Sequence, residues 1–333
     1  MIKVYITEGT PMPIKRQFKG DDNRWGDCEF VFSGDEEYDY LVTIDSLPYI
    51  IESKVDKNHR LLFLGEPPYV KLYNSNFFGQ FGHIYGCNES LIKKGVIKKS
   101  HPVLPWMLGC KLKAGTHKCI SGSTLSYADF SSLTISSINR KNKACLITSR
   151  KVMTAGHRRR VCFADYVLEH HSDIIDVYGN GYQSIPDKFE VMSQYKYSII
   201  IENCSYPNYW TEKISDCYLA GCYPLYYGCT NIEEFFEKEA FTIIDIEKKE
   251  QTIQTLMKCI KENCFENKVS AIINSRKAVL DHYNMFSVIS HIIEKLDSDN
   301  EKSDIVNDTL SPLKYGIWDK IKNRLAKKFE ILM

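Results

Sequence analysis

The sequence predicts an α/β protein of two domains that face a cleft. Its 333 residues exceed one ordinary core and fit two domains of roughly 150 residues. Short apolar runs alternate with helical segments in both halves of the chain. A stretch rich in Ser and Thr (121–137), followed directly by the basic residues 139–143, separates the two series. We therefore predict domains at 1–143 and 144–296, and a C-terminal piece at 297–333.

Each half supplies its own series of elements. In the first half, strands are expected at 3–7, 40–44 and 61–64, with a helical or loop segment at 46–56. In the second half, the expected strands are 144–148, 174–178, 197–202, 223–227 and 241–244. The expected helices are 159–170, 211–220, 253–264 and 271–296. Strands separated by helices pair in parallel, so the second half predicts a doubly wound sheet.

Composition and charge exclude several classes of function. The formal charge is +1, from 43 basic and 42 acidic side chains, so no global field attracts nucleic acid and we expect no such partner. The N-terminus is typical of an alternating strand rather than of a signal peptide. No apolar run approaches the roughly 20 residues of a membrane-spanning helix. We expect a cytoplasmic protein, whose 12 cysteines are buried free thiols rather than disulfides or metal ligands.

The most informative stretch is 195–228. Here a buried strand ends in Glu202 and Asn203, a polar loop follows, and a helix opens at Thr211, Glu212 and Lys213. Ligands of open α/β sheets bind beyond the carboxyl ends of the strands, where helix N-termini suit phosphate. Lys213 is placed to neutralise a diphosphate, and Glu212 to accept hydrogen bonds from a ribose diol. Ordinary capping by Thr211 with a surface Glu-Lys pair is the alternative, and spacing alone leaves both open.

This stretch resembles the signature of the family-10 α-1,3/4-fucosyltransferases. Cys204 and Trp210 depart from the usual pattern, which affects the detail of the donor pocket. The matching positions run without a gap through Tyr195, Tyr197, Glu202, Asn203, Tyr209, Thr211, Glu212, Lys213, Ala220, Gly221, Pro224 and Gly228. The resemblance implies a GT-B fold of two Rossmann-like domains, with an acceptor domain first and a GDP-sugar domain second. It implies inverting, metal-independent transfer of L-fucose from GDP-fucose to a glycan hydroxyl, α-1,3 to a GlcNAc-type residue of a surface oligosaccharide.

The resemblance also implies roles for single residues. In the segment 144–163 an arginine grips the donor diphosphate; by register it is Arg160, with Arg158 and Arg159 as neighbouring alternatives. The remaining donor-binding residues are Glu202, Asn203, Tyr209, Glu212 and Lys213. The segment 176–179 resembles a strand end of the family, where Gly179 allows close backbone approach.

In the first domain, the strand at 61–64 leads into Gly65, Glu66 and two prolines, which resembles the segment that carries the general base of the family. The acceptor hydroxyl must lose its proton as it attacks, so Glu66 is the predicted catalytic residue. A turn with a surface Glu is the alternative. The aromatic segment 76–82 follows and is expected to face the acceptor.

No cofactor or metal is expected. The only Asp-x-Asp triplet, Asp297 to Asp299, lies in a charged stretch, and fingerprints of mononucleotide and dinucleotide loops are absent from the sequence. Two other functions stay open: the same fold with another GDP-linked 6-deoxyhexose as donor, and a catalytically silent, lectin-like or scaffold protein. A donor screen and a measurement of GDP release separate them.

The C-terminal piece predicts a charged linker (297–304) and an amphipathic basic helix (about 312–329). Ile317, Ile321, Leu325 and Phe329 recur every fourth residue beside Trp318, with Lys and Arg on the remaining surface. Such a helix suits an anionic membrane, and bacterial members of the resembled family have tails of this kind, so peripheral attachment to the inner face is one expectation. The alternative is a closing helix whose apolar stripe packs across the two domains.

Overall fold

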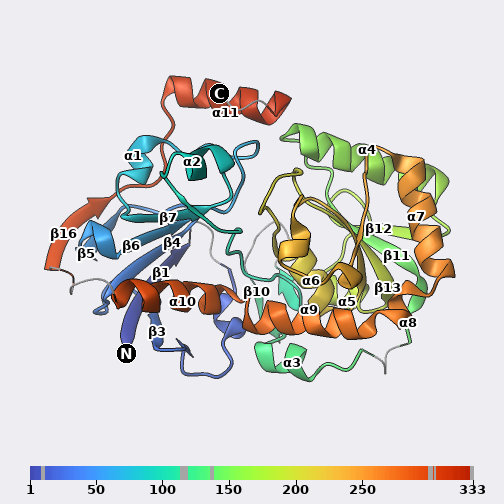
Figure 1. Cartoon of the computed structure of the whole chain (residues 1–333), viewed down its shortest axis with the longest axis horizontal. Helices are drawn as coiled ribbons and strands as arrows, with labels where there is room; N and C mark the ends of the chain where they lie inside the picture. Colours follow the sequence, from blue (N-terminus) through green and yellow to red (C-terminus); the bar gives the residue numbers. More distant parts are fainter. Residues whose placement is uncertain (9–11, 113–118, 136–138, 299–302, 304, 331–333) are drawn as a thin grey trace. The chain divides into compact units, whose positions relative to one another are not determined.

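The computed structural model describes residues 1–8, 12–112, 119–135, 139–298, 303 and 305–330 (Figure 1). These residues form two compact units. The first comprises Met1–Pro105 and His282–Met333, and the second comprises Trp106–Asp281. The boundaries therefore differ from the predicted 143/144 and 296/297. The predicted facing cleft of the two domains stays a prediction.

The first unit contains a seven-stranded sheet in the order β2-β3-β1-β4-β6-β7-β8. Every neighbouring pair is parallel except the antiparallel pair of β2 and β3. The strands are β1 (Ile2–Glu8), β2 (Arg24–Trp25), β3 (Cys28–Val31), β4 (Tyr40–Ile44), β6 (Arg60–Phe63), β7 (His83–Gly86) and β8 (Lys98–Lys99). The short helices of this unit are η1 (Ile14–Gln17), η2 (Lys57–His59), α1 (Ser75–Phe78) and α2 (Glu89–Lys93).

Alternation along the central strands gives this sheet two buried faces. Val4 and Val42 belong to one hydrophobic cluster, whereas Tyr5 and Leu41 belong to the other. The first cluster is completed by helix α10 (Met285–Asp297), which contributes Phe286. Because strands of a parallel sheet are buried on both faces, the expected runs at 3–7, 40–44 and 61–64 are almost continuously apolar.

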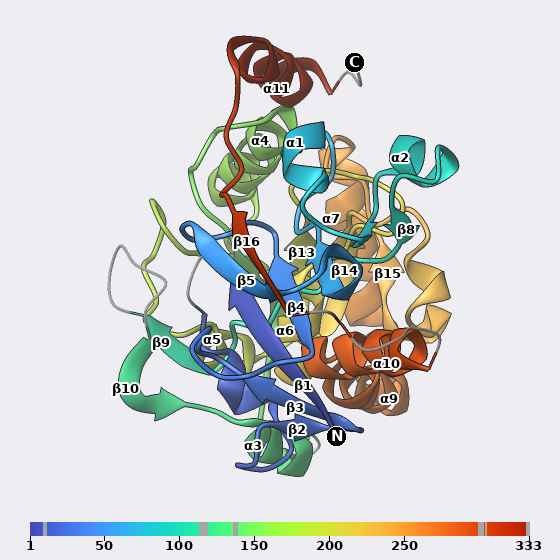
Figure 2. The same ribbon diagram turned by 90° about the vertical axis from the view of Figure 1, so that its left-hand side faces the viewer.

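The second face is covered by a strand pair that the sequence did not predict. Residues 46–56 contain β5 (Ile51–Val55) rather than only the predicted helical or loop segment, and β5 pairs antiparallel with β16 (Ile305–Leu310) from the C-terminal piece (Figure 2). Every second residue of β5 is buried, and Leu310 at the end of β16 is 1% exposed. Since the partner strand lies about 250 residues away in sequence, no local pattern reveals the pairing.

The predicted helix 271–296 is two helices, α9 (Val269–Asp281) and α10, with a break at 282–284. Asn284 begins α10: its Oδ1 accepts from the amide of Phe286 at 3.0 Å, and its Nδ2 donates to the carbonyl of Gln17 at 2.9 Å. The second bond ties α10 to the N-terminal segment. The polypeptide therefore returns to the first unit at this break, which explains why the predicted second domain extends too far.

The second unit contains a five-stranded sheet in the order β12-β11-β13-β14-β15, and all its pairs are parallel. In Figure 1, α4 and α7 lie on one side of this sheet and α6 and α9 on the other. The strands are β11 (Lys141–Ile147), β12 (Ile175–Tyr178), β13 (Tyr195–Ile201), β14 (Tyr223–Tyr227) and β15 (Thr242–Ile243). The helices are α4 (Ala155–His170), α5 (Lys188–Met192), α6 (Glu212–Leu219), η3 (Ile232–Glu234), η4 (Lys238–Ala240), α7 (Lys249–Lys261), α8 (Cys264–Asn267) and α9. Apart from the divided helix 271–296, the predicted strands and helices of this half are present, and two Rossmann-like units confirm the α/β, GT-B class.

The predicted domain boundary at 121–137 lies within the second unit, where the described part of this segment contains the end of β10 (Cys119–Thr124) and α3 (Tyr127–Ser132). β10 pairs with β9 (Cys110–Leu112). A capping box between Ser126 and Asp129 starts α3, and Phe130 is fully buried in edge contact with Trp106. Polar residues here cap a helix, which is why their composition resembled a linker. Residues 136–138 lie outside the described part.

The cysteines are mostly buried free thiols, as expected, but Cys110 is disulfide-bonded, which corrects the expectation for that residue. Cys162 is an exposed thiol. Among the described residues, no helix is long and apolar enough to cross a membrane.

Candidate functional site

The second unit has its topological switch point between β11 and β13. The chain leaves β11 for β12 on one side and then crosses to β13 on the other side. Ligands of such sheets bind outside the carboxyl ends of the two strands that flank this point. Here those ends lead into Thr148 and Ser149 after β11, and into Glu202 and Asn203 after β13.

Glycines bring the backbones at this edge close together. A Cβ atom on Gly156, in the first turn of α4, would lie 1.9 Å from the carbonyl oxygen of Asn203. At Gly179, where φ is +116°, a Cβ would lie 1.8 Å from the carbonyl oxygen of Thr148. The N-terminal turn of α4 is therefore pressed against the β13 loop, as only glycine permits. The close approach predicted at Gly179 is confirmed.

Arg160 reaches across the switch point from α4. Its Nη1 donates to Oδ1 of Asn203 at 2.9 Å, and its Nη2 donates to Oγ of Ser149 at 3.5 Å. The residue is 7% exposed, and this burial lowers the pKa of its guanidinium, although Glu202 and Glu212 oppose the shift. The Nε atom of Arg160 and the Oγ1 atom of Thr148 are buried and have no hydrogen-bond partner within the described part of the chain.

Arg160, the arginine that the register of the sequence motif selected, is also the one that lies at the carboxyl edge of the second sheet. Arg158 is exposed on the first turn of α4, and Nε of Arg159 lies 3.2 Å from a carboxylate oxygen of Glu247 on the loop before α7. Arg160 alone of these three lies between the two strand ends. A planar guanidinium can donate two parallel hydrogen bonds, so it is suited to a bidentate contact with phosphate.

Glu202 holds the start of α6. Its Oε1 accepts from the amide of Thr211 at 2.9 Å, and its Oε2 accepts from the hydroxyl of Thr211 at 2.8 Å. Glu202 is 1% exposed, and burial raises the pKa of its carboxyl while Lys213, with its Nζ 3.3 Å from Oε2, opposes the shift. Both carboxylate oxygens are thus occupied within the protein. Tyr209 is 0% exposed. These two predicted donor-binding residues are therefore buried, and Glu202 bonds to the loop at Thr211.

Glu212 and Lys213 lie at the N-terminus of α6 and remain accessible, with side chains 20% and 24% exposed. Lys213 Nζ donates to the hydroxyl of Thr211 at 3.0 Å and to Glu212 Oε1 at 3.4 Å. Burial alone raises the pKa of Glu212, but Lys213 and Lys188 lower it to about 2. Glu212 is therefore an ionised acceptor of hydrogen bonds at neutral pH.

Two residues that sequence reasoning missed support this helix start. Lys188 Nζ lies 2.6 Å from Oδ2 of Asp216, which is 1% exposed. Burial lowers the pKa of Lys188, but Asp216 and Glu212 raise it above its usual value, so its charge is retained. Oδ1 of Asp216 accepts two backbone amides, those of Met107 and Leu108, at 3.0 Å each. The two residues are 28 positions apart in sequence, so no local pattern reveals the pair.

The first unit places Glu66 in a comparable position. Glu66 follows β6, and Asp45 follows the neighbouring parallel strand β4, so both lie beyond carboxyl ends at one edge of the sheet. Asp45 accepts from Lys71 Nζ at 2.6 Å and from the Tyr73 hydroxyl at 2.5 Å. Burial and Asp45 raise the pKa of Tyr73, whose oxygen also accepts the backbone amide of Glu66. Asp45, another residue that the sequence reasoning missed, thereby fixes the Glu66 loop.

Glu66 lines a cavity of about 350 Å³ in the first unit. The cavity is also lined by residues that follow β7, from the loop around Lys71, and from the C-terminal piece. The expected aromatic segment contributes little: Phe77 and Phe81 are each 2% exposed and pack in the hydrophobic core. The expectation that these rings face an acceptor is wrong, because they complete the face that β5 and β16 cover.

The two sites together hold carboxylates, cations and helix starts. Among the described residues, no three His, Cys, Asp or Glu side chains are grouped so as to hold a metal ion. In the second unit, the cations at the strand ends and at the start of α6 are Arg160, which is 7% exposed, and Lys213, whose side chain is 24% exposed. Cations at such an edge suit a phosphate-bearing ligand. In the first unit, the accessible carboxylate of Glu66 is a group that takes up a proton.

Similarity to known proteins agrees with this geometry. Residues 138–269 match the model of the glycosyltransferase family 10 (fucosyltransferase) C-terminal region. A stretch of 61 residues is 36% identical to the α-(1,3)-fucosyltransferase FucT of Helicobacter pylori. That stretch spans 18% of this chain and 13% of the relative.

Solved structures of glycosyltransferases are also similar. An α1,3-fucosyltransferase with GDP-fucose has 16% identity and a TM-score of 0.48, over 91% of this chain and 92% of that chain. Anabaena HepE in complex with UDP has 11% identity and a TM-score of 0.47, over 90% of this chain and 100% of that chain. The matched region 138–269 contains all five strands of the second sheet and the six predicted donor residues. Residues 138–269 of this chain therefore match the C-terminal region of glycosyltransferase family 10, the fucosyltransferases.

Proposed function

We propose that this protein is an inverting, metal-independent fucosyltransferase that transfers L-fucose from GDP-fucose to a glycan hydroxyl, α-1,3 to a GlcNAc-type residue of a surface oligosaccharide. The observation that carries the proposal is Arg160, which spans the switch point of a sheet that lies within the family-10 region. Guanidinium and ammonium groups at this edge suit the diphosphate of a GDP-sugar.

In the proposed reaction, Glu66 accepts the proton of the acceptor hydroxyl. The hydroxyl oxygen attacks the anomeric carbon of fucose from the face opposite the diphosphate, and the bond between that carbon and the phosphate oxygen breaks. Arg160, Lys213 and the amides of α6 stabilise the charge on the departing GDP, which supports a mechanism that needs no metal. Glu212 and Asn203 are proposed to bind the donor, while Glu202 and Tyr209 position the loop.

The test is incubation of the purified protein with GDP-fucose and a panel of N-acetyllactosamine-type acceptors, analysed by mass spectrometry and linkage NMR. Glu66→Gln keeps the size of the side chain but removes its basicity, so turnover should fall by roughly a hundredfold or more, while GDP affinity is unchanged. The exposed Glu37→Gln of the same unit is the control. Near-normal turnover of Glu66→Gln would give the role to another carboxylate. A donor screen distinguishes fucose from other GDP-linked 6-deoxyhexoses.

We also propose that helix α11 (Ile317–Phe329) attaches the protein to an anionic membrane surface on the cytoplasmic side. Ile317, Trp318 and Phe329 are 78%, 74% and 53% exposed, and lysines flank them. The residues of α11 that are buried are Asn323 and Ala326. The alternative is a closing helix whose apolar stripe packs across the two domains. An apolar stripe with basic flanks supports binding at a lipid surface.

A further inference from the structure

The cavity beside Glu66 has a wall that comes from the far end of the sequence. Three of its lining residues, Tyr315, Asp319 and Lys322, belong to the C-terminal piece. The other lining residues follow β6 and β7, at the carboxyl edge of the sheet. Residues separated by about 250 positions thus share one cavity of the first unit.

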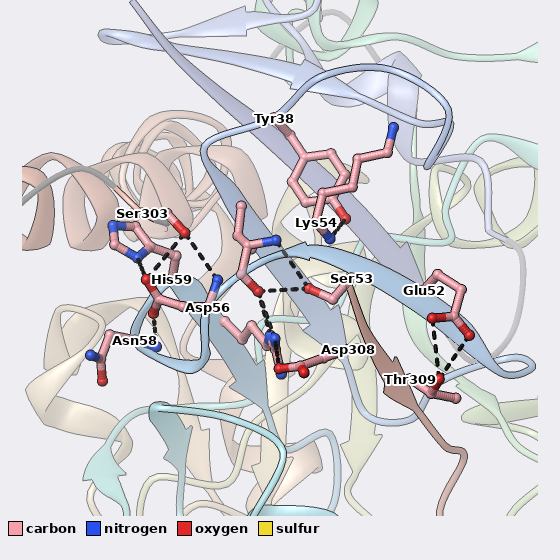
Figure 3. Close-up of polar contacts among 12 residues, drawn as sticks. Tyr38, Glu52, Ser53, Lys54, Asp56, Asn58, His59, Ser303, Asp308 and Thr309 are labelled. Carbon is pink, nitrogen blue, oxygen red and sulfur yellow. Dashed lines mark hydrogen bonds and ion pairs between the residues drawn. The ribbon is translucent and has the colours of Figure 1, made fainter. Parts of the chain in front are cut away.

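The C-terminal piece is fixed to this unit by specific bonds. Nη2 of the buried Arg60 donates to Oδ2 of Asp308 in β16 at 2.5 Å. Figure 3 shows Thr309 of the same strand against Glu52 of β5, whose carboxylate accepts from the Thr309 hydroxyl at 2.9 Å. Farther along, the amide of Ser311 donates to Oε1 of Gln80 at 2.6 Å, and Nε2 of Gln80 donates back to the carbonyl of Ser311 at 3.1 Å. These bonds place the chain that enters the cavity wall.

The wall itself is held by bonds to the loop that follows Glu66. The Tyr315 hydroxyl donates to the carbonyl of Leu72 at 2.8 Å, and Nδ2 of Asn74 donates to the carbonyl of Lys314 at 2.7 Å and to Oδ2 of Asp319 at 3.1 Å. Asp319 and Asn323 lie four residues apart and share the face of α11 that is directed to this loop. Lys322 is next to that face, on the cavity side.

The cavity is lined by three lysines, Lys71, Lys94 and Lys322, and by the carboxylates of Glu66 and Asp319. Lys71 is paired with Asp45 at 2.6 Å, and Asp319 bonds to Asn74 and to the amide of Gly316 at 3.2 Å. Lys94 and Lys322 also line the cavity, and in the part of the chain that the structure describes neither has an ion-pair partner. Two lysines that form no ion pair among the described residues therefore line the cavity that contains Glu66, the proposed base.

We propose that the C-terminal piece completes the acceptor site, and that Lys94 and Lys322 bind an anionic group of the acceptor glycan, a carboxylate, sulfate or phosphate, next to the hydroxyl that Glu66 deprotonates. The inference rests on the proposed function for the identity of the hydroxyl. The cavity volume of about 350 Å³ is at the small end of the range for ligand sites, which suits one or two sugar residues. In this arrangement, one face of α11 lines the acceptor cavity and another binds the membrane surface.

The experiment compares two soluble acceptors that differ only in one sulfate group on an otherwise identical N-acetyllactosamine. For Lys322→Gln and Lys94→Gln, KM for the sulfated acceptor should rise about three- to tenfold, as expected for a partly exposed charged hydrogen bond. The value of kcat, and both constants for the neutral acceptor, should stay unchanged. Lys320→Gln, on the same helix but outside the cavity lining, is the matched control. Equal effects on both acceptors, or an equal effect of the control, would overturn the inference.

Binding in the absence of GDP-fucose separates this inference from the proposed function. Calorimetric titration with the sulfated acceptor alone should show weaker binding to Lys322→Gln than to the unaltered protein. If the unaltered protein binds this saccharide through Lys322 but transfers no fucose, the inference stands and the proposed function fails. If it transfers fucose but binds the sulfated and neutral acceptors equally, the proposed function stands and the inference fails. A carboxylated and a phosphorylated acceptor then identify the preferred anion.

Discussion

Replacement of Arg160 is the sharpest test of the donor site. Arg160 is 7% exposed and bonds to Asn203 at 2.9 Å, so the structure itself depends on it to a small degree. Loss of a bidentate charged contact with a diphosphate should cost about 2–3 kcal/mol of binding free energy, which weakens GDP affinity about 30- to 150-fold. Arg160→Lys keeps the charge but lacks the planar fork, so it should recover only part of this affinity.

Two measurements separate a ligand contact from a structural role. Calorimetric titration with GDP gives the affinity, and thermal unfolding gives the stability of the same variants. A lost bond to Asn203 is worth about 1 kcal/mol, which corresponds to a Tm shift of about 2–4 °C. Arg158→Ala removes an exposed arginine two residues away and serves as the control. If Arg160→Ala lowers Tm but leaves GDP affinity within twofold, Arg160 is structural and the reasoning about the switch point is refuted.

The other predictions concern stability, pH, metal and membrane. A chain shortened after Asp304 lacks β16 and leaves Arg60, 3% exposed, without Asp308, so the free energy of unfolding should fall by about 3 kcal/mol or more. A chain that ends at Gly316 retains this strand and should unfold at a nearly normal temperature; equal Tm values for the two would contradict the pairing. Burial lowers the pKa of His101 to about 4. Between pH 6.5 and 4 the unfolded state therefore binds a proton that the folded state excludes, so the free energy of unfolding decreases as the pH is lowered, by about 3 kcal/mol over the whole window. His101→Gln should flatten this part of a pH series of unfolding measurements, and an unchanged slope would disprove the assignment. Transfer activity should survive EDTA; strict dependence on Mn²⁺ or Mg²⁺ would count against the mechanism. The full chain, but not the Trp318→Asp variant, should sediment with anionic liposomes at low salt, and equal sedimentation would argue against attachment through α11.

Local patterns determined the second sheet and the positions of its proposed donor-binding residues. Its strands are short apolar runs separated by helices, and each is defined by neighbours in sequence. Polar residues directly after β13 predicted the position of the site, because the carboxyl ends of parallel strands share one edge. The resemblance then selected Arg160 among three adjacent arginines, and the structure places that side chain, rather than its neighbours, between the strand ends. Glu66 was found in the same way, after a strand of the first sheet.

Burial of polar residues was decided by tertiary structure. Glu202 and Tyr209 match the family signature, but the signature does not tell a ligand contact from a residue that holds the loop. Their exposures of 1% and 0% follow from packing against Thr211 and the core. Lys188 and Asp216, like Asp45 and Tyr73, act as pairs that are far apart in sequence. Single positions of this kind carry no periodic or spacing signal.

The course of the chain between the units was likewise decided by contacts that are remote in sequence. Composition suggested a boundary at 121–143, but Phe130 packs against Trp106 and holds that segment in the second unit. The apolar pattern predicted one helix at 271–296, whereas Asn284 ends it by bonding to Gln17. β5 needed β16 as a partner from the opposite end of the sequence. The hydrophobic periodicity of each element and the polar residues at the strand ends are local features. The sequence therefore determined the helices and strands and the sheet edge at which the donor is proposed to bind. Pairing, capping across the chain and the wall of the cavity depend on which distant segments meet, and only the tertiary structure decided these.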